Sequence, residues 1–207
     1  MKYIYEFIGT FFLVFTVGMT VYGTHAAGLL APLAIGSALA VMVFAGGHVS
    51  GGHYNPAVSF AIYIRGKLSL ANLGKYWIAQ LVGGILAAFL TIYLNGYPTQ
   101  PPLALMPVKA LLAEFIFTFA LCFVVLNVAI AKGTKGNSFY GWAIGFTVLV
   151  GAYAVGSISG GAFNPAVALG ITIMQLSSWA NLWIFIIANL VGGLCAALVF
   201  KKVDQKA

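Results

Sequence analysis

The stretch GGHVSGGHYNPAVSF, Gly46–Phe60, has a counterpart in VGSISGGAFNPAVALG, Val155–Gly170. Both place glycines in front of the tripeptide Asn-Pro-Ala, and the two asparagines, Asn55 and Asn164, are 109 positions apart (164 − 55). An asparagine side chain caps a helix amino terminus well, and proline is best tolerated in the first helical turn. The two stretches therefore predict two helices that begin in the same way in two related halves of the chain.

The composition places these halves in a membrane. The chain has 207 residues, of which 62% are hydrophobic and only 6% are charged. A soluble domain carries about 25% charged residues, so this sequence predicts an integral membrane protein with lipid as its surroundings. The net charge of +7 does not indicate a nucleic-acid partner, because the lysines form short clusters between apolar runs rather than one long basic stretch.

The lengths of the apolar runs predict the architecture. A helix needs about 20 apolar residues to cross roughly 30 Å of hydrocarbon. Six runs qualify: Tyr3–Tyr22, Ala31–His48, Ala71–Leu94, Val108–Ala131, Phe139–Ser157 and Trp179–Phe200. Two shorter runs, Asn55–Ile64 and Asn164–Met174, would reach only about 15 Å as helices. We therefore expect an all-α membrane protein with six transmembrane helices and two re-entrant half-helices that begin near the bilayer midplane.

The repeat extends beyond the Asn-Pro-Ala motifs. EFIGTF at Glu6–Phe11 matches EFIFTF at Glu114–Phe119, and QLVGGILAA at Gln80–Ala88 matches NLVGGLCAA at Asn189–Ala197. Each half then holds three spans, and an odd number of spans gives the two halves opposite orientations, as in an inverted 3+3 repeat. We expect a single domain over residues 1–207, with repeat one at about 1–97 and repeat two at about 108–203.

The basic residues predict the orientation. Six spans place nearly all of them on one side: Lys2, Arg65, Lys67, Lys75, Lys132, Lys135, Lys201, Lys202 and Lys206, with Lys109 alone on the other side. Cytoplasmic loops carry an excess of Lys and Arg. Both termini are therefore expected in the cytoplasm, with the protein in the plasma or inner membrane.

Two half-helices that meet at their amino termini favour one class of permeating molecule. Each terminus carries roughly half a positive charge, and the amides of Asn55 and Asn164 would face the same space, with backbone carbonyls on either side. A neutral molecule that forms hydrogen bonds can pass, whereas an ion would lose its hydration there. The sequence thus predicts a passive pore for small uncharged solutes. It contains no nucleotide-binding loop, nucleophile–base pair or metal cluster, which argues against an enzyme, a cofactor or a metal.

Two other classes of membrane protein remain open from the residues alone. A secondary transporter also uses inverted repeats and broken helices, but it usually needs charges inside the membrane. This chain offers only Glu6 and Glu114, near span ends. A structural protein with a closed pore could use the same scaffold. Saturable transport would indicate the transporter, and the absence of flux would indicate the closed scaffold.

The motifs AEFIFTF, GGHVSGGHYNPAV and SGGAFNPAV resemble the signature of the aquaporin, or major intrinsic protein, family, and the resemblance covers essentially the whole chain. It implies a homotetramer in which each protomer has its own pore. It places the two motifs at the pore centre: Asn55, Pro56, Ala57, Asn164, Pro165 and Ala166.

The resemblance also implies roles for residues around the motifs. The pore-lining carbonyls would belong to Gly51, Gly52, His53, Gly160, Gly161 and Ala162. Glu6 and Glu114 match buried carboxylates that brace the re-entrant loops by accepting hydrogen bonds.

A four-residue selectivity filter is implied at Ile35, Ala152, Gly161 and Val167. Most members of the family carry arginine at the last position, and water-selective members add a histidine and a bulky aromatic residue. Valine there resembles some plant tonoplast members and some bacterial metalloid channels. We expect a wide, weakly polar filter that passes water and larger neutral solutes, such as glycerol, urea, ammonia, hydrogen peroxide or metalloid hydroxides. An essentially water-selective aquaporin is the alternative.

Overall fold

The computed structural model describes residues 1–24 and 26–204, and Lys206, one of the basic residues counted for orientation, lies outside them. Within the described residues the elements are helices, without strands. Six are long and apolar enough to cross a membrane. The long helices are α1 (Lys2–Val21), α2 (Ala31–Ser50), α4 (Leu70–Asn95), α5 (Pro107–Val125), α6 (Tyr140–Ser159) and α8 (Leu182–Asp204), and the short ones are α3 (Pro56–Ile64) and α7 (Pro165–Ile173). The predicted all-α fold with two half-helices is confirmed.

Helix ends differ from the predicted ends by a few residues, for identifiable reasons. Helices α2 and α6 each run about two residues further than expected, to a glycine in the left-handed conformation: Gly51 at φ 92° and Gly160 at φ 93°. Such a glycine is a common helix stop. Helix α5 continues into a π-helical turn at Leu126–Ile130, which completes the fourth predicted span.

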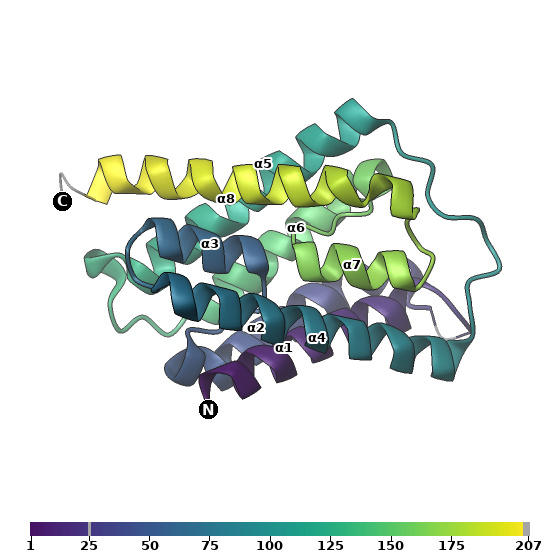
Figure 1. Ribbon diagram of the computed structural model, residues 1–207, viewed down its shortest axis with the longest axis horizontal. Coiled ribbons are helices and arrows are strands. Elements are labelled where there is room, and N and C mark those ends of the chain that lie inside the picture. The colour runs from purple at the N-terminus through teal and green to yellow at the C-terminus, as the bar shows by residue number, and fades with distance from the viewer. Residues whose placement is uncertain (25, 205–207) are drawn as a thin grey trace.

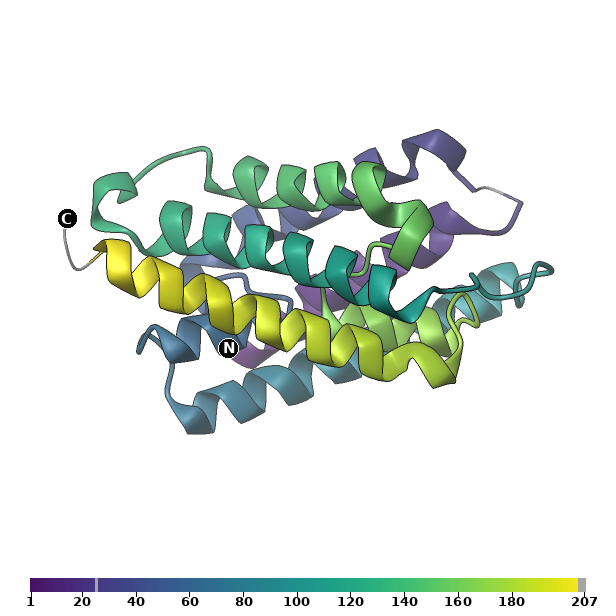
Figure 2. The ribbon, with the colours of Figure 1, turned by 90° about the horizontal axis from the view of Figure 1, so that it is seen from above.

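The long helices lie side by side and slanted, and the two half-helices sit between them (Figure 1). Helices α3 and α7 approach one another from opposite ends of the bundle and touch where they begin. Viewed from above, α5 and α8 run next to one another across the middle of the picture (Figure 2). The beginning of α1 and the end of α8 lie toward the same end of the molecule (Figure 1).

The packing follows the inverted repeat. Helix α1 packs against α4 as α5 packs against α8, and α2 packs against α6 between the two halves. Each half-helix packs mainly against the third long helix of the opposite half: α3 against α8, and α7 against α4. The two repeats are therefore interlocked, because each one supplies part of the support for the other's half-helix.

Small residues make this interlocking possible. A Cβ atom added to Gly84 on α4 would lie 3.0 Å from the carbonyl oxygen of Ala166, and one added to Gly193 on α8 would lie 2.8 Å from that of Ala57. Close backbone approach through glycine is typical of helix packing in membranes. The second glycine of each repeated Gly-Gly pair thus serves as the seat, or close-packing site, for the opposite Asn-Pro-Ala motif.

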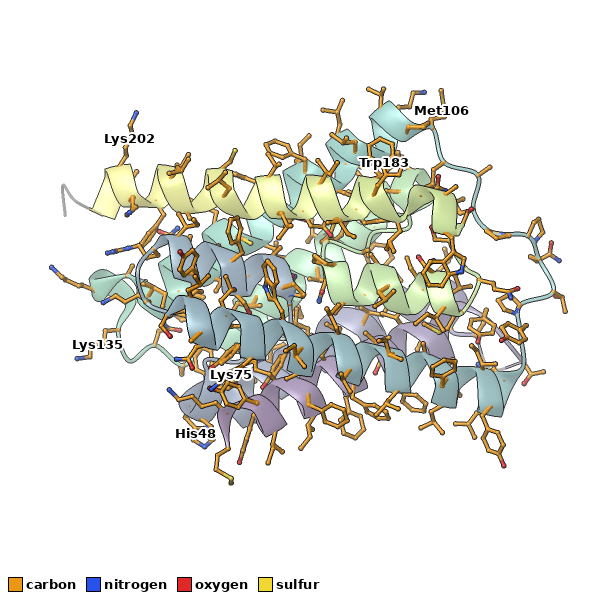
Figure 3. All side chains as sticks on the ribbon, in the orientation of Figure 1. His48, Lys75, Met106, Lys135, Trp183 and Lys202 are labelled. Carbon is orange, nitrogen blue, oxygen red and sulfur yellow. The ribbon has the colours of Figure 1, made fainter. Side chains whose placement is uncertain are left out.

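The surface has the distribution expected of a membrane protein. Large apolar side chains such as Ile78, Phe89 and Tyr93 on α4 are exposed. Lysines gather at one end of the bundle, where Lys75, Lys135 and Lys202 are labelled, whereas Trp183 lies toward the opposite end (Figure 3). The chain is an integral membrane protein with a basic end and an apolar flank.

Candidate channel site

Each half-helix begins at its asparagine, as predicted. The Oδ1 atom of Asn55 accepts a hydrogen bond from the backbone N–H of Ala57 at 2.8 Å. The Oδ1 atom of Asn164 accepts from the N–H of Ala166 at 2.9 Å and from that of Val167 at 3.4 Å. Proline occupies the first helical position in both. The caps satisfy amide groups that a helix start leaves without partners.

The same two side chains also join the halves. The Nδ2 atom of Asn55 donates to the carbonyl oxygen of Phe163 at 2.9 Å, and the Nδ2 atom of Asn164 donates to that of Tyr54 at 2.9 Å. An amide nitrogen has two N–H donors, and both asparagines line the central cavity. The second donor of each is therefore the one that a molecule in the cavity can reach.

The turns in front of the asparagines share one backbone conformation. Positive φ angles occur at equivalent places in both: Gly51 at 92°, Gly52 at 62°, Tyr54 at 47°, Gly160 at 93°, Gly161 at 66° and Phe163 at 48°. Glycine adopts this conformation without strain, which explains the glycine clusters of both motifs. The tyrosine and the phenylalanine are held in it by burial and by the contacts described next.

The carboxylate of Glu6 holds the first turn. Its Oε1 atom accepts hydrogen bonds from Ser50 Oγ at 2.7 Å and from the backbone N–H of His53 at 3.0 Å. Its Oε2 atom accepts from the N–H of Tyr54 and from Gln80 Nε2, both at 2.7 Å. Glu6 is fully buried, and a buried carboxylate needs such donors to be stable. The four bonds tie the turn to α1, α2 and α4.

Glu114 holds the second turn in the same manner. Its Oε1 atom accepts from Ser159 Oγ at 2.7 Å and from the N–H of Ala162 at 3.0 Å. Its Oε2 atom accepts from the N–H of Phe163 at 2.7 Å and from Asn189 Nδ2 at 3.0 Å. Both acids thus make the kind of contact that the family resemblance implied for them.

A cavity of about 60 Å³ lies where the half-helices meet, which is room for several water molecules. Both asparagines line it, together with the four positions where a filter was predicted: Ile35, Ala152, Gly161 and Val167. Among the residues predicted to line the pore with their carbonyl groups, those that line the cavity are His53, Gly160, Gly161 and Ala162. Gly51 and Gly52 are not among its lining residues.

On one side this cavity shares wall residues, among them Ile35 and Ala152, with a second hollow of about 840 Å³. The second hollow is bounded by residues 97–101 and Leu103, at the end of the bundle opposite the lysine-rich end. None of the described residues that line the central cavity is Asp, Glu, Lys or Arg. The site is therefore a narrow chamber without a fixed side-chain charge, and it shares residues with a larger basin at the end opposite the lysine-rich one.

Sequence reasoning missed the residues that support the turns from behind. Gln80 and Asn189 are polar, fully buried and located in the middle of transmembrane helices. Their equivalent places in QLVGG and NLVGG were a signal, since a polar residue repeated within an apolar span needs a partner. Trp77 was also missed, and its Nε1 atom donates to the carbonyl oxygen of Pro56 at 2.9 Å.

A model of the family described as "Major intrinsic protein" matches residues 1–200. The chain belongs to the major intrinsic protein family. It is 35% identical to "Probable aquaporin TIP2-2" of Oryza sativa subsp. japonica, over 97% of this chain and 86% of that protein. It is 34% identical to "Nodulin-26" of Glycine max, over 98% of this chain and 77% of that protein.

A solved structure adds support for the fold. The X-ray structure of the aquaglyceroporin from Plasmodium falciparum superimposes with a TM-score of 0.81 at 22% identity, covering 100% of this chain and 98% of that one. Members of the major intrinsic protein family are passive channels and not enzymes. This major intrinsic protein is therefore a membrane channel of the water-conducting family, as its repeated motifs predicted.

Proposed function

We propose that the channel passes water and larger neutral solutes, such as glycerol, urea, ammonia, hydrogen peroxide or metalloid hydroxides. The pathway runs through the cavity at Asn55 and Asn164. The outer filter consists of Ile35, Ala152, Gly161 and Val167, four residues that line one cavity. The observation that carries the proposal is the valine at the last of these positions.

Val167 makes the filter wide and weakly polar. Its side chain lies in the first turn of α7 and lines the cavity. An arginine would fill this place with a planar cation that bears several donors. Valine supplies neither charge nor donor, and the facing walls are the small residues Ala152 and Gly161. A solute bulkier than water therefore meets less steric and electrostatic resistance.

Ions are excluded by the two half-helices. Their amino termini face one another across the cavity, and each carries roughly half a positive charge. The Nδ2 donors of Asn55 and Asn164 add to the positive potential. No carboxylate lines the cavity among the described residues. A cation entering it would lose hydration without gaining a counter-charge.

The two alternatives predict different behaviour. An essentially water-selective aquaporin would need a tighter filter than valine and alanine provide. A secondary transporter would need a free ionisable group inside the membrane. Each buried carboxylate already accepts four hydrogen bonds from its turn and helices. These acids support a structural role, which favours a channel.

We assign the channel to a single domain of residues 1–207, with repeats at about 1–97 and 108–203, and to a homotetramer in the plasma or inner membrane. The beginning of α1 and the end of α8 lie at the lysine-rich end of the bundle (Figures 1 and 3). The excess of positive charge there supports a cytoplasmic location for that end.

Stopped-flow light scattering on proteoliposomes tests the proposal. The purified protein should raise the permeability to water and to glycerol or urea above that of empty vesicles, without saturating as the solute concentration rises. Water flux alone would identify a water-selective channel. Saturable solute flux would identify a transporter, and no flux of either would contradict a conducting role.

A further inference from the structure

The inverted repeat gives the cavity two comparable walls, an outer wall and an inner wall nearer the lysine-rich end. Ile35 on α2 lies about one turn from the outer end of its helix, and Ile144 on α6 lies about one turn from the inner end. Val167 and Val58 hold equivalent places in the first turns of α7 and α3. All four residues line the cavity. At these positions the two walls have the same residue types.

The walls differ at the position of Ala152. Its equivalent in the first repeat is Val43, and the contacts of the turns confirm the pairing. A Cβ atom added to Gly161 would lie 3.5 Å from the Cα of Ala152, and one added to Gly52 would lie 3.4 Å from the Cα of Val43. Valine is larger than alanine and is buried here. Ala152 lines the cavity, whereas Val43 lies behind the lining residues, so the inner wall has a bulkier backing at this position.

The walls also differ at the second residue before each asparagine. The outer wall has Ala162, and the inner wall has His53, which lines the cavity. The imidazole is held from two sides. Its Nδ1 atom lies 3.0 Å from Ser59 Oγ, and its ring lies 5.0 Å from the ring of Tyr76. Because the ring is fixed by these contacts, it acts as a permanent part of the wall.

Both differences place the larger side chain on the inner side. The outer wall, in addition, shares residues with the basin of about 840 Å³. We propose that the narrowest part of the pathway is an inner collar, formed by His53, Val58 and Ile144 and backed by Val43, rather than the outer filter. This inference rests on the proposed channel function. It assigns size discrimination to residues on the cytoplasmic half of the pathway.

A matched pair of substitutions tests the location. Ile144→Ala removes bulk from the inner collar, and Ile35→Ala removes the same bulk from the outer filter. The inner variant should raise the glycerol-to-water permeability ratio several-fold in proteoliposomes, and the outer variant should raise it by less than about twofold. A larger gain for the outer variant, or equal gains for both, overturns the inference.

A second variant tests the same inference by adding bulk to the outer wall, in case Ile144→Ala or Ile35→Ala impairs folding. The double variant Ala152→Val with Ala162→His copies the inner side chains onto the outer wall. If the inner collar limits flux, adding a similar resistance in series should lower glycerol flux by about twofold at most. A much larger loss would show that the outer filter was limiting. His53→Ala, which retains the backbone N–H bound by Glu6, should raise glycerol flux.

The outcomes separate this inference from the proposed function. If the unmodified protein conducts neither water nor glycerol, the channel proposal fails. If it conducts both, and the outer variant has the greater effect, the channel proposal stands and only the inner collar is wrong.

Discussion

The turn before Asn55 and the turn before Asn164 have the same backbone and are held by equivalent carboxylates. Glu6 accepts four hydrogen bonds in the first, and Glu114 accepts four in the second. The identity of these contacts shows what the re-entrant turn requires. It needs a buried acceptor for two backbone amides, because those amides have no partners within the turn itself.

The side chains behind the carboxylates differ. Gln80 donates both to Glu6 and to Ser59 Oγ, on the half-helix itself. Asn189 donates both to Glu114 and to Thr118 Oγ1, on the long helix α5. The longer side chain of Gln80 reaches Ser59, whereas the shorter side chain of Asn189 reaches Thr118. Both turns therefore require the carboxylate, whereas the second hydrogen-bond partner of the supporting amide differs between them.

The largest expected effect comes from removing the shared acceptor. Glu114→Gln replaces one carboxylate oxygen by an NH2 group, which must oppose the N–H group of either Ala162 or Phe163 and cannot accept from it. The substitution should lower the free energy of unfolding by about 3 kcal/mol or more. Glu6→Gln should be comparably damaging if the two turns are equivalent. Thermal unfolding in detergent measures both variants. A loss confined to one of them would break the equivalence.

The glycine seats come next. Gly193→Ala brings a Cβ to 2.8 Å from the carbonyl oxygen of Ala57, and Gly84→Ala brings one to 3.0 Å from that of Ala166. Overpacking against backbone should destabilise the protein by about 1–3 kcal/mol, more for Gly193. Gly74→Ala is the control, because a Cβ there meets nothing within 4 Å. A melting temperature for Gly193→Ala as high as that of the control would contradict the seat assignment.

Charge at the outer filter should change selectivity. Val167→Arg should lower glycerol flux by roughly tenfold, about 1.4 kcal/mol, and should lower water flux less. Val167→Leu separates size from charge and should produce a smaller decrease in glycerol flux. Flux is measured in proteoliposomes with equal protein content. An unchanged glycerol-to-water ratio in the arginine variant would count against the filter assignment.

The smallest effect is expected at Ser59, which has a natural alanine, Ala168, at its equivalent place. Ser59→Ala removes the partner of both His53 and Gln80 and should destabilise the protein by about 1 kcal/mol. The remaining bond from Gln80 to Glu6 should preserve the turn. Unfolding as severe as that of the glutamate variants would show that the two turns depend on different anchors.

Much of the fold could be predicted from the sequence because the membrane restricts the choices. Six apolar runs of sufficient length and two short ones after Asn-Pro leave little freedom. The glycine clusters and the pair Glu6 and Glu114 were also recognisable, since they recur at nearly the same spacing, 109 positions for Gly51 and Gly160 (160 − 51) and 108 for the two acids (114 − 6). These positions carry constraints that only a few residue types satisfy.

The remaining contacts could not be predicted because they depend on distances across the bundle. The hydrogen bonds from Asn55 to Phe163 and from Asn164 to Tyr54 join residues that are more than 100 positions apart in the sequence. The spacing of residues in the sequence also does not predict the hydrogen bond from Gln80 to Ser59, or the contact with Ser59 that fixes the ring of His53. Such contacts are set by how closely the helices approach, which the glycines permit but do not specify.

The reciprocal asparagine bonds have a consequence for how such a chain can originate. Each repeat presents one amide donor and one carbonyl that only the opposite repeat can satisfy. A polypeptide of half the length would have to pair with a second copy inserted upside down to complete the same centre. Fusion of the two copies into one gene product then guarantees one of each orientation, and it frees the two ends of the passage to diverge in sequence.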